Sequence, residues 1–140
     1  MNKTKKLTGF VIALLLVACS VSSNSSDRFI DKLEYKNIEP VKVIEGKASF
    51  YANKYHRRKT ANGETYNMFG YTAASPDLPF DTILRVVNLK NNLSVIIRVN
   101  DRMPRHPERI IDLSYGTARE LEMVEDGVVR VKLEILEWGR

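Results

Sequence analysis

Two short segments carry carboxyl groups in places where a carboxyl group can do chemistry. Thr60-Ala61-Asn62-Gly63-Glu64 places an acid just beyond an Asn-Gly pair that forces a tight turn. In Val99-Asn100-Asp101-Arg102 an apolar run ends abruptly in a carboxylate and a guanidinium. Two carboxyl groups from different loops are a common requirement when a glycosidic oxygen is protonated while another proton is removed. The structural alternatives are a capped turn and an exposed ion pair.

The elements that must position these residues are short β-rich runs. Strands are predicted over 41–44 and 47–51, around Gly46, and over 83–87 and 94–99, on either side of a turn at Lys90-Asn91-Asn92. Residues 128–136 alternate between apolar and charged side chains, which predicts a half-buried strand.

Only the segment after Ser114 has a pattern that predicts a helix of any length. Ser114 can cap it, Ala118 and Leu121 belong to its apolar face, and it stops before the Asp126-Gly127 turn. Six or so short strands with one helix favour a small β-barrel, because a parallel sheet needs a crossover helix after nearly every strand.

The N-terminus has the pattern of an export signal. Lysines precede an apolar run over 10–18, which is about half the length needed to cross a bilayer. The run ends Leu16-Val17-Ala18-Cys19, which resembles the bacterial lipobox, so Cys19 is expected to carry the lipid anchor. Ser20 comes next, which by resemblance to Gram-negative lipoproteins favours the outer membrane, facing the periplasm. We therefore expect a signal over 1–18, a lipidated flexible tether over 19–39 and one domain over 40–140.

Composition excludes several classes of function. The chain has 140 residues, and the part after the signal is too short for a multidomain enzyme. The net charge of +5 includes three lysines of the predicted signal, so the charge of the domain itself is smaller. The sequence also has no stripe of Lys and Arg residues of the kind that binds phosphates, so a nucleic-acid partner is not expected. Cys19 is the only cysteine, and His56 and His106 have no Cys or Glu at ligand spacing, so neither a metal site nor a cofactor is expected.

The ordered motifs resemble those of one family. They are Gly46-Lys47-Ala48-Ser49-Phe50-Tyr51, Arg58 to Glu64, Tyr71-Thr72-Ala73-Ala74, Leu78-Pro79, Arg85 to Leu89, Val99 to Arg102 and Arg109 to Ser114. In order and spacing they are similar to the rare lipoprotein A (RlpA) domain, over about 41–138. The resemblance implies a six-stranded double-psi β-barrel. It also implies lytic transglycosylase activity on the glycan strands of peptidoglycan, with a preference for strands stripped of stem peptides.

The resemblance also implies site residues. The acids of the family's Ala-Asn-Gly-Glu and Asn-Asp-Arg motifs are Glu64 and Asp101 here. Ser75 stands where the family has a histidine after Thr-Ala-Ala, and serine cannot carry a proton near neutral pH. Met103 and Ala52 replace family glycines. Many members of the family carry a C-terminal repeat domain that binds glycan, and the sequence up to Arg140 does not contain one. We therefore expect the lipid anchor and the groove of the barrel to bring the protein to its glycan substrate.

The resemblance further implies roles in an endolytic reaction without cofactor or attacking water. Asp101 is expected to be the acid/base because it ends a strand, with Glu64 as stabiliser or base, and the opposite assignment stays open. Asn62, Ser75, Arg102 and Tyr51 are candidate substrate-binding residues, with Arg102 pairing with a carboxylate or the muramic lactyl group and Tyr51 stacking on a sugar. A catalytically weak, wall-loosening glycan-binding lipoprotein and a hydrolase are the alternatives.

Overall fold

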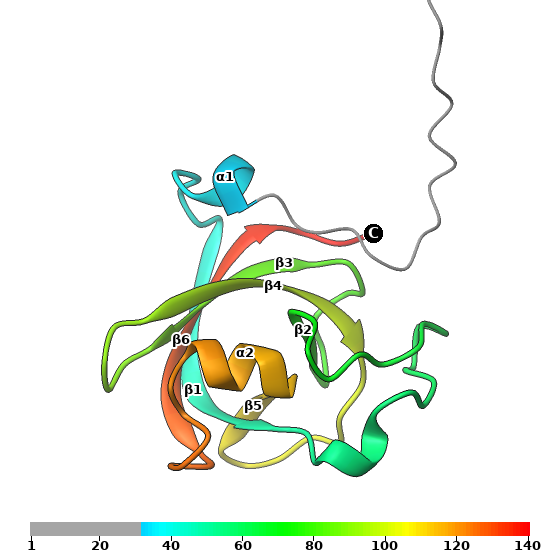
Figure 1. The fold of residues 1–140 in the computed structure, drawn as a ribbon. Helices are drawn as coiled ribbons and strands as arrows, with labels where there is room; N and C mark the ends of the chain where they lie inside the picture. The colour runs from blue at the N-terminus through cyan, green and yellow to red at the C-terminus, as the bar shows by residue number, and fades with distance from the viewer. Residues whose placement is uncertain (1–31) are drawn as a thin grey trace, which may run out of the picture.

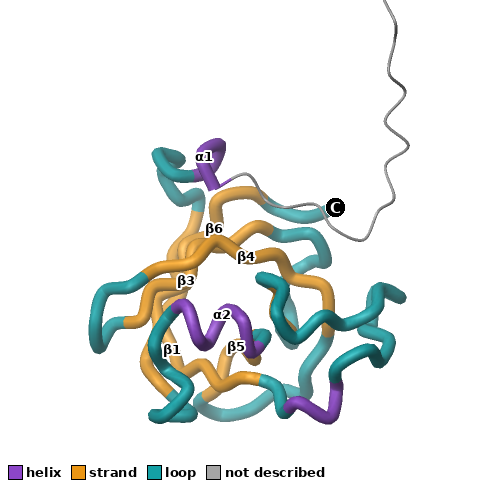
Figure 2. Tube along the Cα trace, viewed as in Figure 1, coloured by secondary structure: helices purple, strands orange, loops and turns teal. Residues whose placement is uncertain are grey.

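The computed structural model describes residues 32–140, so Cys19, the signal and most of the predicted tether lie outside the described residues. The elements in chain order are α1 (Lys32–Tyr35), β1 (Lys42–Phe50), η1 (Asn53–Tyr55), β2 (Thr72–Ala74), β3 (Ile83–Asn88), β4 (Ser94–Asp101), β5 (Arg109–Leu113), α2 (Tyr115–Glu120) and β6 (Val129–Glu137). Figure 2 shows that the segment between β1 and β2 is mostly loop.

The six strands close into a barrel in the order β1-β5-β2-β4-β3-β6. Figure 1 labels each of them. The pairs β1–β5 and β2–β4 are parallel, and the other four pairs are antiparallel. This architecture confirms the predicted small six-stranded barrel. The parallel pairs join strands far apart in the sequence, so they cannot be recognised from local patterns.

The first predicted pair of strands is wrong, because residues 42–50 form the single strand β1. Gly46 lies in the middle of that strand, opposite Val131. A Cβ at Gly46 would come within 2.9 Å of the Ile110 side chain, so glycine is needed here for the close approach of β5 and not for a turn. The irregularity lies one residue further on, where the β1–β5 register shifts between Lys47 and Ala48.

The predicted hairpin and the last strand are confirmed. β3 and β4 pair antiparallel around the turn, in which Asn92 takes the left-handed conformation with φ 61°. β6 alternates between buried and more exposed residues, and its buried side chains join those of β3 and β4 in the core. The interior is therefore filled by alternate residues of each strand, as in other small barrels.

Helix α2 begins as predicted and ends earlier. The Ser114 side chain accepts a hydrogen bond from the backbone N–H of Thr117, which is an N-cap. The helix ends at Glu120, and Glu122 then adopts a left-handed φ of 52°, which stops the helix well before Asp126. Leu121 and Met123 still pack fully in the core, because the tight turn points them inward.

Contacts with the barrel begin upstream of the predicted domain start at residue 40. The Tyr35 hydroxyl donates to Glu137 at 2.6 Å, and the Arg85 guanidinium donates to the backbone carbonyls of Tyr35 and Lys36. These bonds hold the end of α1 and the residues that follow it against β3 and β6. Figure 1 shows the position of α1. Among residues 32–140 no helix is long and apolar enough to cross a bilayer.

Gly116→Ala tests how tightly α2 packs on the loop before β2. The added Cβ would lie 2.5 Å from the Phe69 carbonyl oxygen, a backbone atom that cannot move aside cheaply. We expect the free energy of unfolding to fall by about 1–3 kcal/mol in urea denaturation. Gly70→Ala is the matched control, since its Cβ would meet Asn67 O at an ordinary 3.4 Å. Equal losses in the two variants would contradict this packing.

Candidate active site

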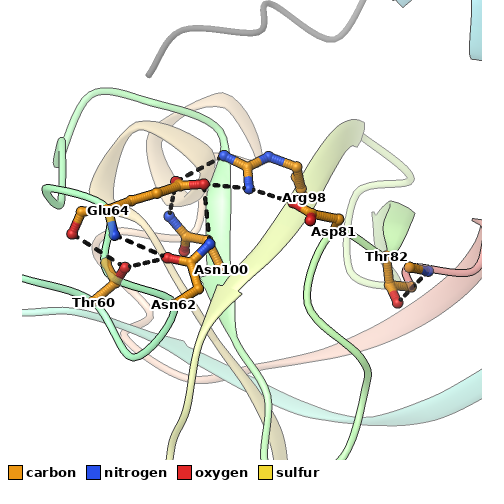
Figure 3. A network of polar contacts seen from close by, with 8 residues as sticks. Thr60, Asn62, Glu64, Asp81, Thr82, Arg98 and Asn100 are labelled. Atoms are coloured by element: carbon orange, nitrogen blue, oxygen red, sulfur yellow. Dashed lines mark hydrogen bonds and ion pairs between the residues drawn. The ribbon is translucent and has the colours of Figure 1, made fainter. Parts of the chain in front are cut away.

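Glu64 is the centre of a polar network that joins the loop after β1 to strand β4 (Figure 3). Its two carboxylate oxygens accept hydrogen bonds from the two terminal nitrogens of Arg98, at 2.7 and 2.8 Å. Asn62 Nδ2 and Asn100 Nδ2 donate to the same carboxylate, each at 3.0 Å. The side chains of Arg98 and Glu64 are only 14% and 24% exposed, so this bidentate pair is largely shielded from water.

The network fixes the charge of Glu64. Burial by itself raises the pKa of the carboxyl group, but hydrogen bonds from Arg98, Asn100 and Asn62 outweigh it and lower the pKa to about 2. Arg98 also pairs with Asp81 at 2.8 Å. Glu64 is therefore a fixed anion whose oxygens are occupied by protein donors.

The turn that carries Glu64 forms for local reasons. Gly63 has φ 88°, which suits glycine, and its N–H donates to the Thr60 carbonyl at 3.0 Å. The Asn62 side-chain oxygen accepts from the Thr60 hydroxyl and from the Glu64 N–H, as an Asx-type turn does. Asn62 was expected to bind substrate, but its amide group forms hydrogen bonds within the turn and with the Glu64 carboxylate.

Asp101 is held by three donors from three segments. One oxygen accepts from the backbone N–H groups of Ala61 and Arg102, and the other accepts from the Tyr51 hydroxyl, all at 2.8 Å. Ala61 belongs to the Glu64 turn, so the Glu64 network positions a donor to Asp101. The turn and the end of β4 are thereby brought together, as the paired motifs predict.

Tyr51 acts on Asp101 through its hydroxyl. Burial raises the pKa of that hydroxyl well above its usual range, and the nearby Asp101 carboxylate raises it further. The phenol therefore keeps its proton and remains a donor to Asp101. Its ring packs edge-on against Tyr66, with centroids 4.9 Å apart.

A pocket of about 290 Å³ opens over Asp101, and we call it the Asp101 pocket. Its lining includes Tyr51, Tyr55, Arg58, Asp101, Arg102 and Asp112. Glu64 does not line it. Of the two carboxylates singled out in the sequence, Asp101 is thus the one that faces this open space.

Asp112 is a second carboxylate in the wall of the Asp101 pocket. Ala74 of β2 pairs with Asp101 on one side and Asp112 on the other, so the two acids lie on one row, two strand spacings apart. That separation is about 9–10 Å along the sheet. Asp112 accepts a hydrogen bond from the Ser49 hydroxyl and pairs with Arg109.

Arg98 was not identified as a site residue from the sequence, although its place in the sequence is unusual. It is the single charged residue within the apolar run of β4, where a cation is costly unless it has a partner. Its partner lies 34 residues upstream, at Glu64. A lone arginine in an apolar strand is therefore the sign of an ion pair that the sequence could not locate.

Arg102 lines the Asp101 pocket but is already engaged. Its guanidinium carbon lies 3.8 Å from the centroid of the Phe80 ring, and Nη1 donates to the carbonyls of Ser75 and Asp101 at 3.4 and 3.3 Å. No ion pair of Arg102 with a carboxylate side chain occurs within residues 32–140.

Ser75 is 2% exposed and borders a separate groove beside Arg105 and Arg109. Its hydroxyl oxygen accepts from the backbone N–H groups of Asp77 and Leu78, which caps the turn after β2. Its own N–H donates to the Asp101 carbonyl at 3.2 Å, so the residue adjoins the site through its backbone.

In residues 32–140, no three side chains of the metal-binding types His, Cys, Asp or Glu gather at a single point. The lining of the Asp101 pocket offers carboxylates, phenols and cations. Two acids that line one open pocket, on the same row of the sheet, suit proton transfer to and from a bound polymer.

The closed barrel with two parallel pairs, and the pocket over Asp101, define a double-psi β-barrel domain. The family model described as "Lytic transglycolase" matches residues 43–133. The Helicobacter pylori protein named endolytic peptidoglycan transglycosylase RlpA is 48% identical over 96 residues, which cover 69% of this chain and 30% of that protein. The Pseudomonas aeruginosa protein of the same name is 52% identical over 89 residues, covering 64% and 26%.

The chain belongs to the RlpA family. It matches about a quarter to two fifths of the length of its curated relatives. Among solved structures, an expansin mutant of Clavibacter michiganensis in complex with cellohexaose aligns with a TM-score of 0.54 at 16% identity, covering 69% of this chain and 51% of that one. That likeness shows the shared fold alone.

Glu64→Gln is expected to remove an acid-sensitive part of the stability. Because the folded-state pKa of about 2 lies below the ordinary 4.5, the stabilisation is fully present above about pH 4.5 and is lost as the pH falls toward 2. With allowance for solvent screening, we expect the variant to lose about 1–2 kcal/mol at pH 7 and to match the parent near pH 2.

Urea unfolding at a series of pH values measures this difference. Glu120→Gln, an exposed acid on α2, is the control and should track the parent at every pH. A Glu64→Gln curve that runs parallel to that of the parent from pH 7 to pH 2 would show that the ion pair adds no stability.

Proposed function

We propose that this domain is an endolytic peptidoglycan lytic transglycosylase that cleaves the bond between N-acetylmuramic acid and N-acetylglucosamine on peptide-poor glycan strands. The observation that carries the proposal is Asp101, a carboxylate held by three donors in the wall of an open pocket. Family membership supports it, since the curated relatives are named endolytic peptidoglycan transglycosylases.

In the proposed reaction Asp101 serves twice. Its carboxyl group protonates the glycosidic oxygen, and the bond from that oxygen to C1 of muramic acid breaks. The C6 hydroxyl of the same sugar then attacks C1 and gives its proton to Asp101. A 1,6-anhydro ring forms, no water is consumed and the carboxyl group is restored.

The other carboxylates take different parts. Asp112 lines the same pocket and supplies negative charge as the sugar ring becomes positive. Glu64 acts as a positioning residue, because Arg98 and two asparagines occupy its oxygens and it holds the turn that presents the Ala61 N–H to Asp101. This assignment differs from the catalytic role that the sequence motif implies for Glu64.

The glycan-binding lipoprotein is the second candidate. Ser75 favours it, because the hydroxyl at the family's histidine position is buried and caps a turn. In that case the Asp101 pocket binds glycan without cleaving it.

We further propose that the domain is tethered to the bacterial outer membrane through a lipid on Cys19 and faces the periplasm. The sequence Leu16-Val17-Ala18-Cys19 after an apolar run supports this anchor. A tethered domain meets the glycan layer at high effective concentration, which suits the modest pocket described above.

Asp101→Asn is expected to lower turnover on peptide-free glycan about 100-fold or more with little change in glycan affinity, because it removes the transferable proton and keeps the size of the side chain. Mass spectrometry of the released anhydromuramyl ends gives turnover, and pull-down on insoluble glycan gives affinity. Asp126→Asn is the control, since Asp126 pairs with Lys90 away from the pocket. A parent domain that binds glycan and releases no anhydro ends would favour the binding lipoprotein.

Cys19→Ala is expected to leave the precursor unlipidated and its signal unprocessed by the lipoprotein signal peptidase. The thioether to diacylglycerol needs the sulfur of Cys19, which is the only cysteine of the chain. Fractionation and labelling with a radioactive fatty acid measure both effects. Ser20→Ala, one residue further on, keeps the cysteine and should retain label, whereas normal processing of the Cys19 variant would refute the anchor.

A further inference from the structure

Arg58 stands in the wall of the Asp101 pocket, two aromatic rings away from the carboxylate. Its guanidinium carbon lies 5.7 Å from the centroid of the Tyr55 ring. The Tyr55 ring lies 6.0 Å from that of Tyr51, whose hydroxyl donates to Asp101. Tyr55 is 42% exposed, and Lys54 Nζ also lies over its ring, 5.3 Å from the centroid. A sugar that stacks on the exposed part of this ring lies beside Arg58.

The backbone of Arg58 is fixed while its side chain is free. Its N–H donates to the Tyr55 carbonyl at 3.1 Å, and its carbonyl accepts from the Tyr66 N–H at 2.8 Å. Within residues 32–140, the guanidinium has the ring of Tyr55 as a neighbour and makes no ion pair or side-chain hydrogen bond. Its donors are therefore available to a ligand.

The other cations of the pocket are engaged. Arg102 stacks on Phe80 and donates to two carbonyls, and Lys59 Nζ lies 3.4 Å from the Thr65 hydroxyl. Basic side chains also outnumber acidic ones in the lining of the Asp101 pocket, where Arg58, Lys59 and Arg102 stand with Asp101 and Asp112. An anionic group on a bound polymer is attracted to this wall.

We propose that Arg58 binds the free lactyl carboxylate of a muramic acid residue stacked on Tyr55, and thereby selects peptide-free glycan. The planar guanidinium matches a carboxylate with two parallel hydrogen bonds. A stem peptide converts that carboxylate to an amide, which removes the charge and adds bulk at the same place. This inference rests on the proposed function and names the residue that sets its substrate preference.

The experiment compares two forms of one substrate, namely peptide-free glycan and the same glycan with its lactyl carboxylates reduced to alcohols. The parent is expected to lose about fivefold to tenfold in kcat/KM on the reduced glycan, as for one charge-assisted hydrogen-bonded pair in a partly solvated site. Arg58→Gln should lose the same factor on the unreduced glycan and nothing further on the reduced one.

Arg57→Gln is the matched control, since it removes the same charge from the neighbouring residue, which is exposed and does not line the pocket. It should discriminate between the two glycans as the parent does. Melting curves establish that both variants are folded. Discrimination that persists in Arg58→Gln, or that disappears in Arg102→Gln instead, would overturn the proposal.

A parent that releases no anhydro ends from any glycan would contradict the proposed function and leave Arg58 still open to test by binding. In that case the readout is the affinity for the same two glycans. Weaker binding of reduced glycan by the parent but not by Arg58→Gln supports carboxylate recognition. Equal affinity of the parent for both glycans refutes it.

Discussion

The paired hydrogen bonds between Glu64 and Arg98 are the contact on which the site depends. They join the turn after β1 to the interior of β4, two segments 34 residues apart. A largely buried ion pair is favourable only when its remaining lone pairs are satisfied. Asn62 and Asn100 meet that condition, so the turn is locked against β4 and the N–H group of Ala61 is aimed at Asp101.

This ion pair gives two carboxylates of similar intrinsic chemistry different surroundings. The oxygens of Glu64 accept hydrogen bonds from protein donors away from the pocket. Asp101 lies in the wall of the pocket and is oriented by hydrogen bonds from Tyr51, Ala61 and Arg102. Because these three donors fix its orientation, the Asp101 carboxylate would need little reorganisation in the proposed reaction. The ion pair of Glu64 with Arg98 and the place of Asp101 in the pocket wall, more than residue type, separate the acid to which we assign positioning from the acid to which we assign proton transfer.

Barrel closure supplies the second acid. Ala74 pairs with both Asp101 and Asp112, which places the two acids on one row although they come from different strands. The same closure sets the pocket beside a loop whose basic residues have no acidic neighbours in sequence. A small barrel thus gathers acids, phenols and a free guanidinium at one place without requiring any of them to be close along the chain.

The sequence by itself determined what depends on neighbouring residues. The Asn62-Gly63 turn, the β3–β4 hairpin, the alternation of β6 and the Ser114 cap arise from backbone preferences and short-range hydrogen bonds. Only the tertiary structure decided that Gly46 serves close packing within one strand, that Glu64 is held by Arg98, and that Asp112 faces the pocket. Each of these depends on strands paired across many intervening residues, and local sequence patterns carry no record of which strands will meet.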